Sequence, residues 1–327
     1  MWDLSFLGYK KKPQAKKANN AVLPAGSVVG RYTITKKLSN GGFGVVYMAQ
    51  RNDGVAVALK EFLPSVIACR TPNDKGQIVC KDPTDALRFD KGLKAFFREA
   101  DMLAQVHNPR IIPIWDVFRA NGTAYFAMPV ERGGTLHAAM RATHLSEQQL
   151  QSIFIQACKG VEALHAKSLL HLDIKPSNMW LRPDNSVLIL DLGASRWEDE
   201  EMKNAQMSRT PGFAAPEQHD DKKISQLGVR TDVYGLCASL LTCLMGTTPI
   251  PANQRFAGSP VISSPQLGQS SSDLLRIINK GMSLQPEMRY KTVADLRREL
   301  ERAPRLMETP RWPETLSKAQ WECPTRK

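Results

Sequence analysis

The sequence predicts an α+β fold, in which an antiparallel sheet with one main helix comes first and a mostly helical region follows. Tyr32, Ile34 and Leu38 lie an even number of residues apart, as on one face of a strand, and so do Val45, Tyr47 and Ala49 in the next segment. The apolar run at residues 55–59, which ends in Lys60, indicates a third strand. Residues 92–106 carry apolar side chains at helical spacing, and this spacing returns over residues 146–164. Strands therefore gather in the first part of the chain and helices in the second.

Length and composition indicate a folded protein of one large or two modest domains. The chain has 327 residues, of which 42% are hydrophobic, so it can bury a sizeable core. Its net charge of +12 raises nucleic acid and anionic membranes as partner classes. We expect no nucleic acid as a partner, because no recognition motif accompanies the charge.

The cysteines and the apolar segments indicate a cytoplasmic protein. The six cysteines are scattered without a C-x-x-C pair, so there is no zinc signature, and their low density is typical of a reducing cytosol. The chain does not start with a basic region followed by an apolar run. The most apolar segment, residues 233–245, is too short to cross a bilayer, and we interpret it as a buried core helix.

A glycine-rich turn joins the first two predicted strands. It has the sequence Leu38-Ser39-Asn40-Gly41-Gly42-Phe43-Gly44-Val45-Val46. Glycines let a backbone approach phosphate groups closely and point its N–H groups at them. Because this turn connects two strands, and not a strand with a helix, it does not fit a dinucleotide-binding site.

Lys60 closes the third predicted strand, and Glu99 lies on the helix predicted over residues 92–106. Between them, residues 62–90 are rich in turn-forming residues, and we interpret this stretch as an insertion. Glu61 follows Lys60 directly, so its side chain points to the opposite face of the strand. A carboxylate that pairs with Lys60 must therefore come from elsewhere in the chain.

The middle of the chain carries the residues with the clearest chemistry. Residues 111–118 and 123–129 predict two more strands, and Ser146 with Gln149 predicts a capping box at the start of the long helix. After this helix comes the stretch His171-Leu172-Asp173-Ile174-Lys175-Pro176-Ser177-Asn178. A strand predicted over residues 186–190 then leads into Asp191-Leu192-Gly193.

These segments, taken in order, resemble the eukaryotic-like Ser/Thr protein kinase family, and its bacterial members most of all. In that family the catalytic loop reads H-R-D-L-x-x-x-N and is followed by D-F-G. The resemblance covers residues 27–303 and implies a bilobal fold, with an N-lobe at 27–131, a C-lobe at 132–303 and ATP between the lobes. Residues 1–26 would be a basic mobile tail and residues 304–327 a tail that contains Pro and Trp.

The resemblance implies a role for each polar residue of the catalytic segments. Asp173 would orient the acceptor hydroxyl and accept its proton, and Lys175 would stabilise the γ-phosphoryl group. Asn178 and Asp191 would hold magnesium. The activation segment would run from Asp191 to Glu217. Within it, Thr210 would bond Asp173 and Lys175, which ties this segment to the catalytic loop.

The resemblance also implies how a nucleotide binds. Lys60, aligned by Glu99, would position the α and β phosphates, and the backbone of the glycine-rich turn would cover them. Adenine would be read by the carbonyl of Pro129 and by both backbone groups of Glu131. The other pocket residues would be Met128 as gatekeeper, Val46 and Ala58 as the roof, and Trp180 as the floor. Trp180 has a plain core position as its alternative interpretation.

Other matches are structural or regulatory. Glu217, in Ala215-Pro216-Glu217, would pair with Arg289, and Asp232 would brace the backbone of the catalytic loop. Leu172 stands where many family members carry an Arg that binds a phosphate on the activation segment. Leucine cannot bind phosphate, so we expect activity that does not depend on phosphorylation of this segment.

The resemblance implies an ATP- and magnesium-dependent protein kinase that phosphorylates Ser and Thr hydroxyls, its own included. A pseudokinase that serves as a binding or scaffold module is the main alternative, and a small-molecule kinase is a second. Ser39, Leu172 and Leu192 depart from the family pattern, but none of them removes a group that touches magnesium, phosphate or the acceptor hydroxyl. Thr210-Pro211 and Ala-Pro-Glu shape a peptide-binding ledge in the family and disfavour a small-molecule kinase.

The N-terminal tail suggests a weak contact with anionic membranes. Five lysines lie within residues 10–17, and Trp2, Phe6 and Leu7 could add apolar contact. The alternative interpretation is a solvated tail.

Overall fold

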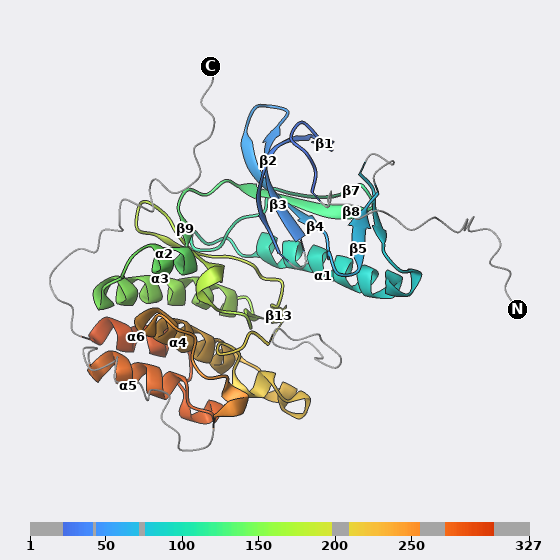
Figure 1. Cartoon of the computed structure of the whole chain (residues 1–327). Helices are drawn as coiled ribbons and strands as arrows, with labels where there is room; N and C mark the ends of the chain where they lie inside the picture. The colour runs from blue at the N-terminus through green and yellow to red at the C-terminus, as the bar shows by residue number, and fades with distance from the viewer. Residues whose placement is uncertain (1–21, 42–43, 72–75, 198–208, 256–271, 304–327) are drawn as a thin grey trace, which may run out of the picture. The chain divides into compact units, whose positions relative to one another are not determined.

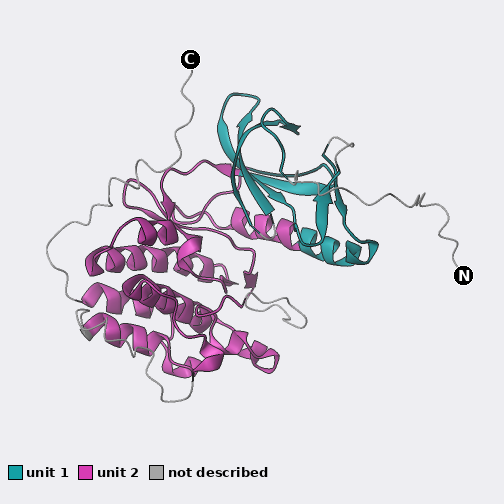
Figure 2. Ribbon diagram, in the orientation of Figure 1, with its two compact units in different colours: residues 1–94, 116–127 teal, residues 95–115, 128–327 magenta. Residues whose placement is uncertain are grey.

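The computed structural model describes residues 22–41, 44–71, 76–197, 209–255 and 272–303. Residues 1–21, residues 304–327 and residues 42–43 of the glycine-rich turn therefore lie outside the described residues. Residues 22–26, which were assigned to the mobile tail, are described, and Leu23 is buried in a core cluster of the first unit. The chain divides into two compact units, which have different colours in Figure 2. The first unit consists of residues 1–94 and 116–127, and the second consists of residues 95–115 and 128–327.

A six-stranded sheet makes up most of the first unit (Figure 1). In spatial order its strands are β1 (Val28–Val29), β2 (Tyr32–Asn40), β3 (Gly44–Arg51), β4 (Ala56–Phe62), β8 (Thr123–Pro129) and β7 (Asp116–Ala120). Tyr47, Val57 and Leu59 are fully buried in one core cluster of this unit. Since side chains alternate along a strand, Ala58 and Lys60 of β4 point to the opposite face of the sheet.

The predicted insertion forms a hairpin, β5 (Ala68–Arg70) with β6 (Ile78–Cys80), and then the start of α1 (Ala86–Gln105). The prediction that this helix begins near Gly92 was therefore wrong. Asp82 accepts a hydrogen bond from the Thr84 N–H and caps a 3₁₀ turn at Pro83–Asp85, which leads directly into α1. An Asp-Pro pair is a helix start signal, so the earlier start was readable from the sequence.

A buried ionic network anchors the hairpin to the sheet. Arg70 donates to both carboxylate oxygens of Glu61 at 2.7 Å, and Glu61 is fully buried. The hydroxyls of Tyr47 and Tyr125 also donate to this carboxylate. Burial raises the pKa of both tyrosines, so they remain protonated donors. Glu61 thus points away from the face that carries Lys60, as the strand alternation predicts.

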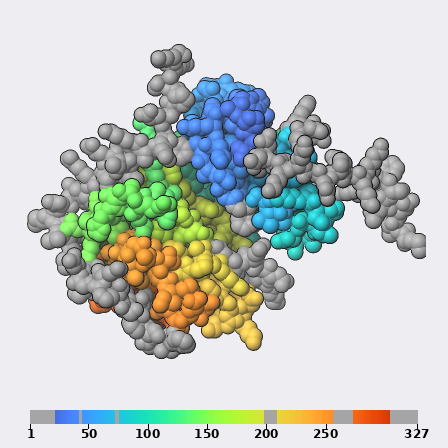
Figure 3. All heavy atoms as spheres, viewed as in Figure 1, coloured from blue at the N-terminus to red at the C-terminus, as the bar shows by residue number. Residues whose placement is uncertain are grey.

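The second unit is mostly helical. After the end of α1 its helices are α2 (Leu136–Ala142), α3 (Glu147–His165), α4 (Val229–Met245), α5 (Ser272–Gly281) and α6 (Val293–Arg302). The second unit also contains the short strands β9 (Gly134–Thr135), β10 (Leu169–Leu170), β11 (Met179–Leu181), β12 (Val187–Ile189) and β13 (Arg196–Trp197). The described segments of this unit pack closely against one another in Figure 3. The predicted α+β fold, with a sheet followed by helices, is confirmed.

Two predictions about helices are confirmed, the capping box at Ser146 and the buried helix at residues 233–245. The predicted capping box is present at the start of α3, where Ser146 N–H donates to Gln149 Oε1 at 2.9 Å and Gln149 N–H donates to Ser146 Oγ at 3.3 Å. The apolar segment 233–245 lies within α4, most of which is buried.

One strand prediction was wrong. Residues 111–118 were expected to form a strand, but β7 begins only at Asp116 and Ile111 makes one isolated bridge to Ile189. Pro113 has no N–H to donate to a ladder, which prevents a regular strand over this stretch. In the described part of the chain, no helix is long and apolar enough to cross a membrane.

Candidate active site

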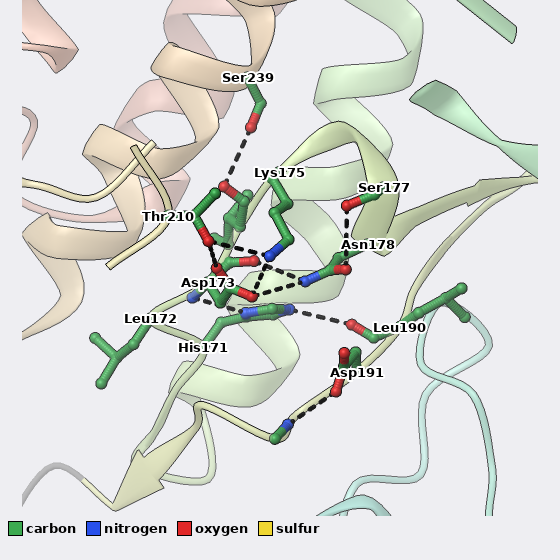
Figure 4. A network of polar contacts seen from close by, with 12 residues as sticks. His171, Leu172, Asp173, Lys175, Ser177, Asn178, Leu190, Asp191, Thr210 and Ser239 are labelled. Atoms are coloured by element: carbon green, nitrogen blue, oxygen red, sulfur yellow. Dashed lines mark hydrogen bonds and ion pairs between the residues drawn. The ribbon is translucent and has the colours of Figure 1, made fainter. Parts of the chain in front are cut away.

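The stretch from His171 to Asn178 gathers the polar groups of the site around Asp173 (Figure 4). Lys175 Nζ donates to Asp173 Oδ2 at 2.7 Å, and Thr210 Oγ1 donates to Oδ1 at 2.7 Å. Lys175 also donates to Thr210 at 3.1 Å, so both contacts expected of Thr210 are present. Asn178 Nδ2 donates to the Asp173 carbonyl at 2.9 Å. The carboxylate is thus held in one orientation by groups from two segments of the chain.

Asp232 braces the backbone of this loop. Its carboxylate accepts the N–H groups of His171 and Leu172, both at 2.8 Å, and the ring Nε2 of His165 lies 2.7 Å from it. Burial alone would raise the pKa of Asp232, but these bonds outweigh it and the net shift is downward. The bracing expected of Asp232 is therefore present.

Leu172 adopts the left-handed backbone conformation, with φ of 61°, although it is not glycine. Asp232 holds its N–H, and Gln218 Nε2 donates to its carbonyl at 2.8 Å. Such a conformation costs on the order of 1–3 kcal/mol and persists only where the surroundings fix it. Gln218 had no signal in the sequence, because its contact lies 46 residues away along the chain.

Asp191 lies beside the same loop in the second unit. The Leu190 N–H donates to the Asn178 carbonyl at 2.8 Å, which joins the strand before Asp191 to the catalytic loop. The Gly193 N–H donates to Asp191 Oδ1 at 3.2 Å. A Cβ at Gly193 would lie 3.1 Å from Asp191 Oδ1 and 3.6 Å from Glu99 Oε2, so the carboxylates of Asp191 and Glu99 both lie close to this glycine.

Asn178 and Asp191 fit a magnesium ion held jointly with phosphates. The amide nitrogen of Asn178 donates to Asp173, so the amide oxygen of Asn178 points away from Asp173. Magnesium is usually bound by one or two carboxylate or amide groups plus phosphate oxygens. Among the described residues, no group of three His, Cys, Asp or Glu side chains could hold a metal by itself.

The first unit holds Lys60, the glycine-rich turn and the two residues predicted to form the roof over adenine. Val46 pairs directly with Lys60 across β3 and β4, and Ala58 lies two residues before Lys60 on the same face. Lys60 Nζ lies 5.2 Å from the centroid of the Phe126 ring. A Cβ at Gly44 would lie 2.4 Å from the Glu61 carbonyl, so only glycine fits there.

The other members of the glycine-rich turn follow the two strands. The Gly41 N–H donates to the Gly44 carbonyl at 2.9 Å. Leu38, Ser39 and Asn40 end β2, and Val45 is buried at the start of β3. Gly42 and Phe43 lie outside the described residues. Lys60 and Glu99 belong to different units, so their pairing stays a prediction.

Residues 128–134, which by the family resemblance would form the adenine-reading hinge, are tied to strand β11. Glu131 accepts a bidentate ion pair from Arg182, and Trp180 Nε1 donates to the Arg132 carbonyl at 3.0 Å. Met128 and Trp180 are partly buried and pack against the core of the second unit. Trp180 thus packs against the core, as its alternative interpretation as a core residue expects. Its role beneath adenine stays a prediction.

The expected pair of Glu217 and Arg289 is present and fully buried. Arg289 donates to the two carboxylate oxygens at 2.7 and 2.9 Å, and Thr231 Oγ1 donates to the first of them at 2.8 Å. The exposed fraction of both side chains is at most 1%. The pair therefore locks the end of the activation segment to the loop before α6.

The fold and this arrangement of residues define a protein kinase domain. A model of that family matches residues 32–298, and the chain belongs to the family. Among characterised proteins it is similar to the serine/threonine-protein kinase PknD of Protochlamydia amoebophila, with 27% identity over 83% of this chain and 29% of that protein. It is equally similar to PknH of Mycobacterium tuberculosis, with 27% identity over 83% of this chain and 41% of that protein. The chain thus spans less than half the length of these relatives.

Solved structures agree with this assignment. The chain is similar to PpkA-294 in its apo form, with a TM-score of 0.74 and 26% identity over 86% of this chain and 99% of that one. The kinase domain of Mycobacterium tuberculosis PknI has a TM-score of 0.62 at 20% identity, over 86% of this chain and 99% of that one, and shows the fold alone. The predicted family and fold are confirmed.

Proposed function

We propose that this chain is a Ser/Thr protein kinase that transfers the γ-phosphoryl group of ATP to protein hydroxyls, its own included. The observation that carries the proposal is the Asp173 carboxylate, which Lys175 and Thr210 hold at 2.7 Å each in a chain of the protein kinase family. The names of the relatives support Ser and Thr as acceptors. A lysine two residues after the aspartate is also typical of Ser/Thr-specific members of the family.

In this proposal each residue keeps one task. Asp173 orients the acceptor hydroxyl and takes its proton late in the transfer, while Lys175 balances charge on the moving phosphoryl group. Asn178 and Asp191 hold magnesium, which neutralises charge between the phosphates when it is bound. Lys60, aligned by Glu99, positions the α and β phosphates, and the turn 38–46 covers them. The hinge, with Met128 and Glu131, reads adenine.

We also propose the boundaries of the domain as residues 27–303, with lobes at 27–131 and 132–303. All five cysteines in the described part of the chain are free thiols, which supports a reducing compartment and a cytoplasmic location. The proposed membrane contact of the N-terminal tail concerns residues outside the described part.

The proposal is tested by incubating the chain with labelled ATP, magnesium and a generic basic protein. We expect label on Ser or Thr of the chain or of the added protein. Nucleotide binding without any transfer would favour the pseudokinase alternative. Transfer to a small amine or alcohol, with none to protein, would favour the small-molecule kinase.

The hydroxyl of Thr210 is expected to contribute directly to turnover. Thr210→Val removes a group that donates to Asp173 and accepts from Lys175, while the β-branched shape of the side chain is kept. A hydrogen bond to a charged group contributes about 1.5–3 kcal/mol, so we expect kcat to fall at least about tenfold. Thr210→Ser keeps the hydroxyl and is the matched control. Equal turnover numbers for the Val and Ser variants would show that the hydroxyl is dispensable.

Activity is expected without phosphorylation of the activation segment. Leu172 is buried, and its backbone is fixed by Asp232 and Gln218, so this part of the loop is ordered by contacts that involve no phosphate. Ser195 is buried and its hydroxyl donates to the His171 carbonyl, so this serine is poorly placed to be phosphorylated. A second serine of the activation segment, Ser208, lies outside the described residues.

This independence is measured on protein that was expressed with a phosphatase and shown by mass to be unmodified. Its initial rate should lie within about tenfold, or about 1.4 kcal/mol in barrier, of that of the phosphorylated protein. A pronounced lag would instead point to a substitute phosphate receptor. Arg196 and Arg209 are the candidates, although Arg209 already pairs with Asp221 and Arg196 donates to the Ser195 carbonyl at 2.7 Å.

A further inference from the structure

One side chain of strand β11 and one directly after it hold two consecutive hinge residues. Arg182 follows the last residue of β11, and its Nε and Nη2 donate to the two carboxylate oxygens of Glu131 at 2.7 and 2.6 Å. Trp180, two residues earlier, donates from Nε1 to the Arg132 carbonyl at 3.0 Å. Side chains two residues apart in an extended chain point the same way, so Arg182 and Trp180 act on the hinge from one side.

Arg182 also reaches a third segment. Its Nη1 donates to the carbonyl of Pro109 at 3.2 Å, in the loop that follows α1. Arg110, next in that loop, accepts at its carbonyl from the Ile189 N–H of strand β12 at 2.7 Å. One guanidinium therefore connects the hinge, the end of β11 and the loop after α1, all within the second unit.

The ion pair between Arg182 and Glu131 is bidentate and partly buried, so it restrains both side chains more than an ordinary surface ion pair does. Arg182 and Glu131 have exposed side-chain fractions of 24% and 18%, so both are mostly shielded from water. The hydrogen bonds with Glu131 raise the pKa of Arg182, which stays charged throughout the accessible pH range. A planar guanidinium that matches a carboxylate with two parallel bonds fixes its orientation as well as its position.

From this arrangement we infer that Arg182 is a positioning residue for the nucleotide: it fixes Glu131 so that the backbone of the hinge is already in the conformation that reads adenine. The inference rests on the proposed function, in which the N–H and carbonyl of Glu131 contact the base. A hinge that samples other conformations binds more weakly in proportion to the fraction of time it is competent. Arg182 therefore acts on nucleotide affinity, while the groups around Asp173 act on the transfer.

The test measures ADP binding by calorimetry, which requires no phosphoryl transfer. For Arg182→Gln we expect the Kd for ADP to rise about five- to tenfold, as for a competent fraction reduced to about 10–20%. In steady-state assays the same change should appear in KM for ATP and not in kcat. Arg182→Lys keeps the charge without the fork, so it should fall between the wild type and the Gln variant.

The chain offers a closely matched control. Arg297 donates to both oxygens of Glu162, at 2.7 and 3.4 Å, and the exposed fractions of this pair are 22% and 27%. Arg297 also donates to both oxygens of Glu301 on α6, at 2.9 and 3.1 Å. Arg297→Gln thus removes an ion pair of similar burial between α6 and α3, and a second pair within α6, away from the hinge sequence. It should leave the Kd for ADP unchanged. The double exchange Glu131→Arg with Arg182→Glu restores the pair in reverse and should recover most of the lost affinity.

The outcomes separate the two proposals. A wild-type chain that binds no ADP overturns the proposed function and this inference with it. A wild type that binds ADP, with Arg182→Gln equal to it, overturns the inference and leaves the function intact. Equal losses for Arg182→Gln and Arg297→Gln would also overturn it, because they would show a general effect on folding. If Arg182→Gln does not fold, Arg182→Lys and the double exchange decide between the same outcomes.

Discussion

Replacing Asp173 with Asn is expected to reduce phosphoryl transfer by about 10²–10⁴-fold and to leave nucleotide binding close to that of the wild type. The amide has nearly the shape of the carboxylate, but it carries no charge and cannot take a proton from the acceptor hydroxyl. It also cannot accept from Lys175, Thr210 and Asn178 together, because one of its two positions is itself a donor. The measurement is the initial rate of label transfer, with the Kd for ADP determined on the same preparations.

The control for this variant is Asp184→Asn, an exposed aspartate in the turn between β11 and β12, whose carboxylate accepts from the Ser186 N–H at 2.9 Å. It should transfer phosphate at the wild-type rate. An Asp173→Asn protein that kept more than about a tenth of the wild-type rate would place the reaction at another residue.

Replacing Arg289 with Ala is expected to lower the free energy of unfolding by about 3–5 kcal/mol, because it leaves the Glu217 carboxylate buried without its cation. Arg289 also donates to the backbone carbonyls of Ser283 and Arg230, at 2.8 and 3.0 Å, so its loss leaves several acceptors unsatisfied. The measurement is urea denaturation followed by fluorescence of the whole chain.

A surface pair in the same unit provides the comparison. Arg276 and Glu299 join α5 and α6 at 3.3 Å, and the Arg276 side chain is 58% exposed. Arg276→Ala should change the free energy of unfolding by no more than about 1 kcal/mol. If the two variants were equally stable, the buried pair would contribute no more than the exposed one.

The parts of the fold that depend on local patterns could be predicted from the sequence. The spacing of apolar residues over β2 and β3 and the capping box at Ser146 both depend on neighbours in the chain, and the two strands and the capping box are present. The errors occurred where a local signal was missed. The start of α1 follows from the cap at Asp82, and the failure of a strand at residue 111 follows from Pro113.

Contacts between distant segments could be predicted only through the family resemblance. Glu217 and Arg289 are 72 residues apart, and nothing in their local sequence relates them. Where the resemblance offered no guide, the contacts were not predicted at all. The burial of Glu61 with Arg70 and the clamp of Glu131 by Arg182 are both of this kind, because an isolated Glu or Arg at a strand end reads as a solvated residue.

We expect Asp173, Asn178 and Asp191 to form one centre for phosphoryl transfer. A crystal structure of the chain with magnesium and an ATP analogue that cannot transfer its γ-phosphoryl group would test this. We predict magnesium bound to Asn178 Oδ1 and to the Asp191 carboxylate, with the γ-phosphoryl group beside Lys175 and Asp173. A nucleotide bound with its phosphates and metal away from these residues would contradict the claim.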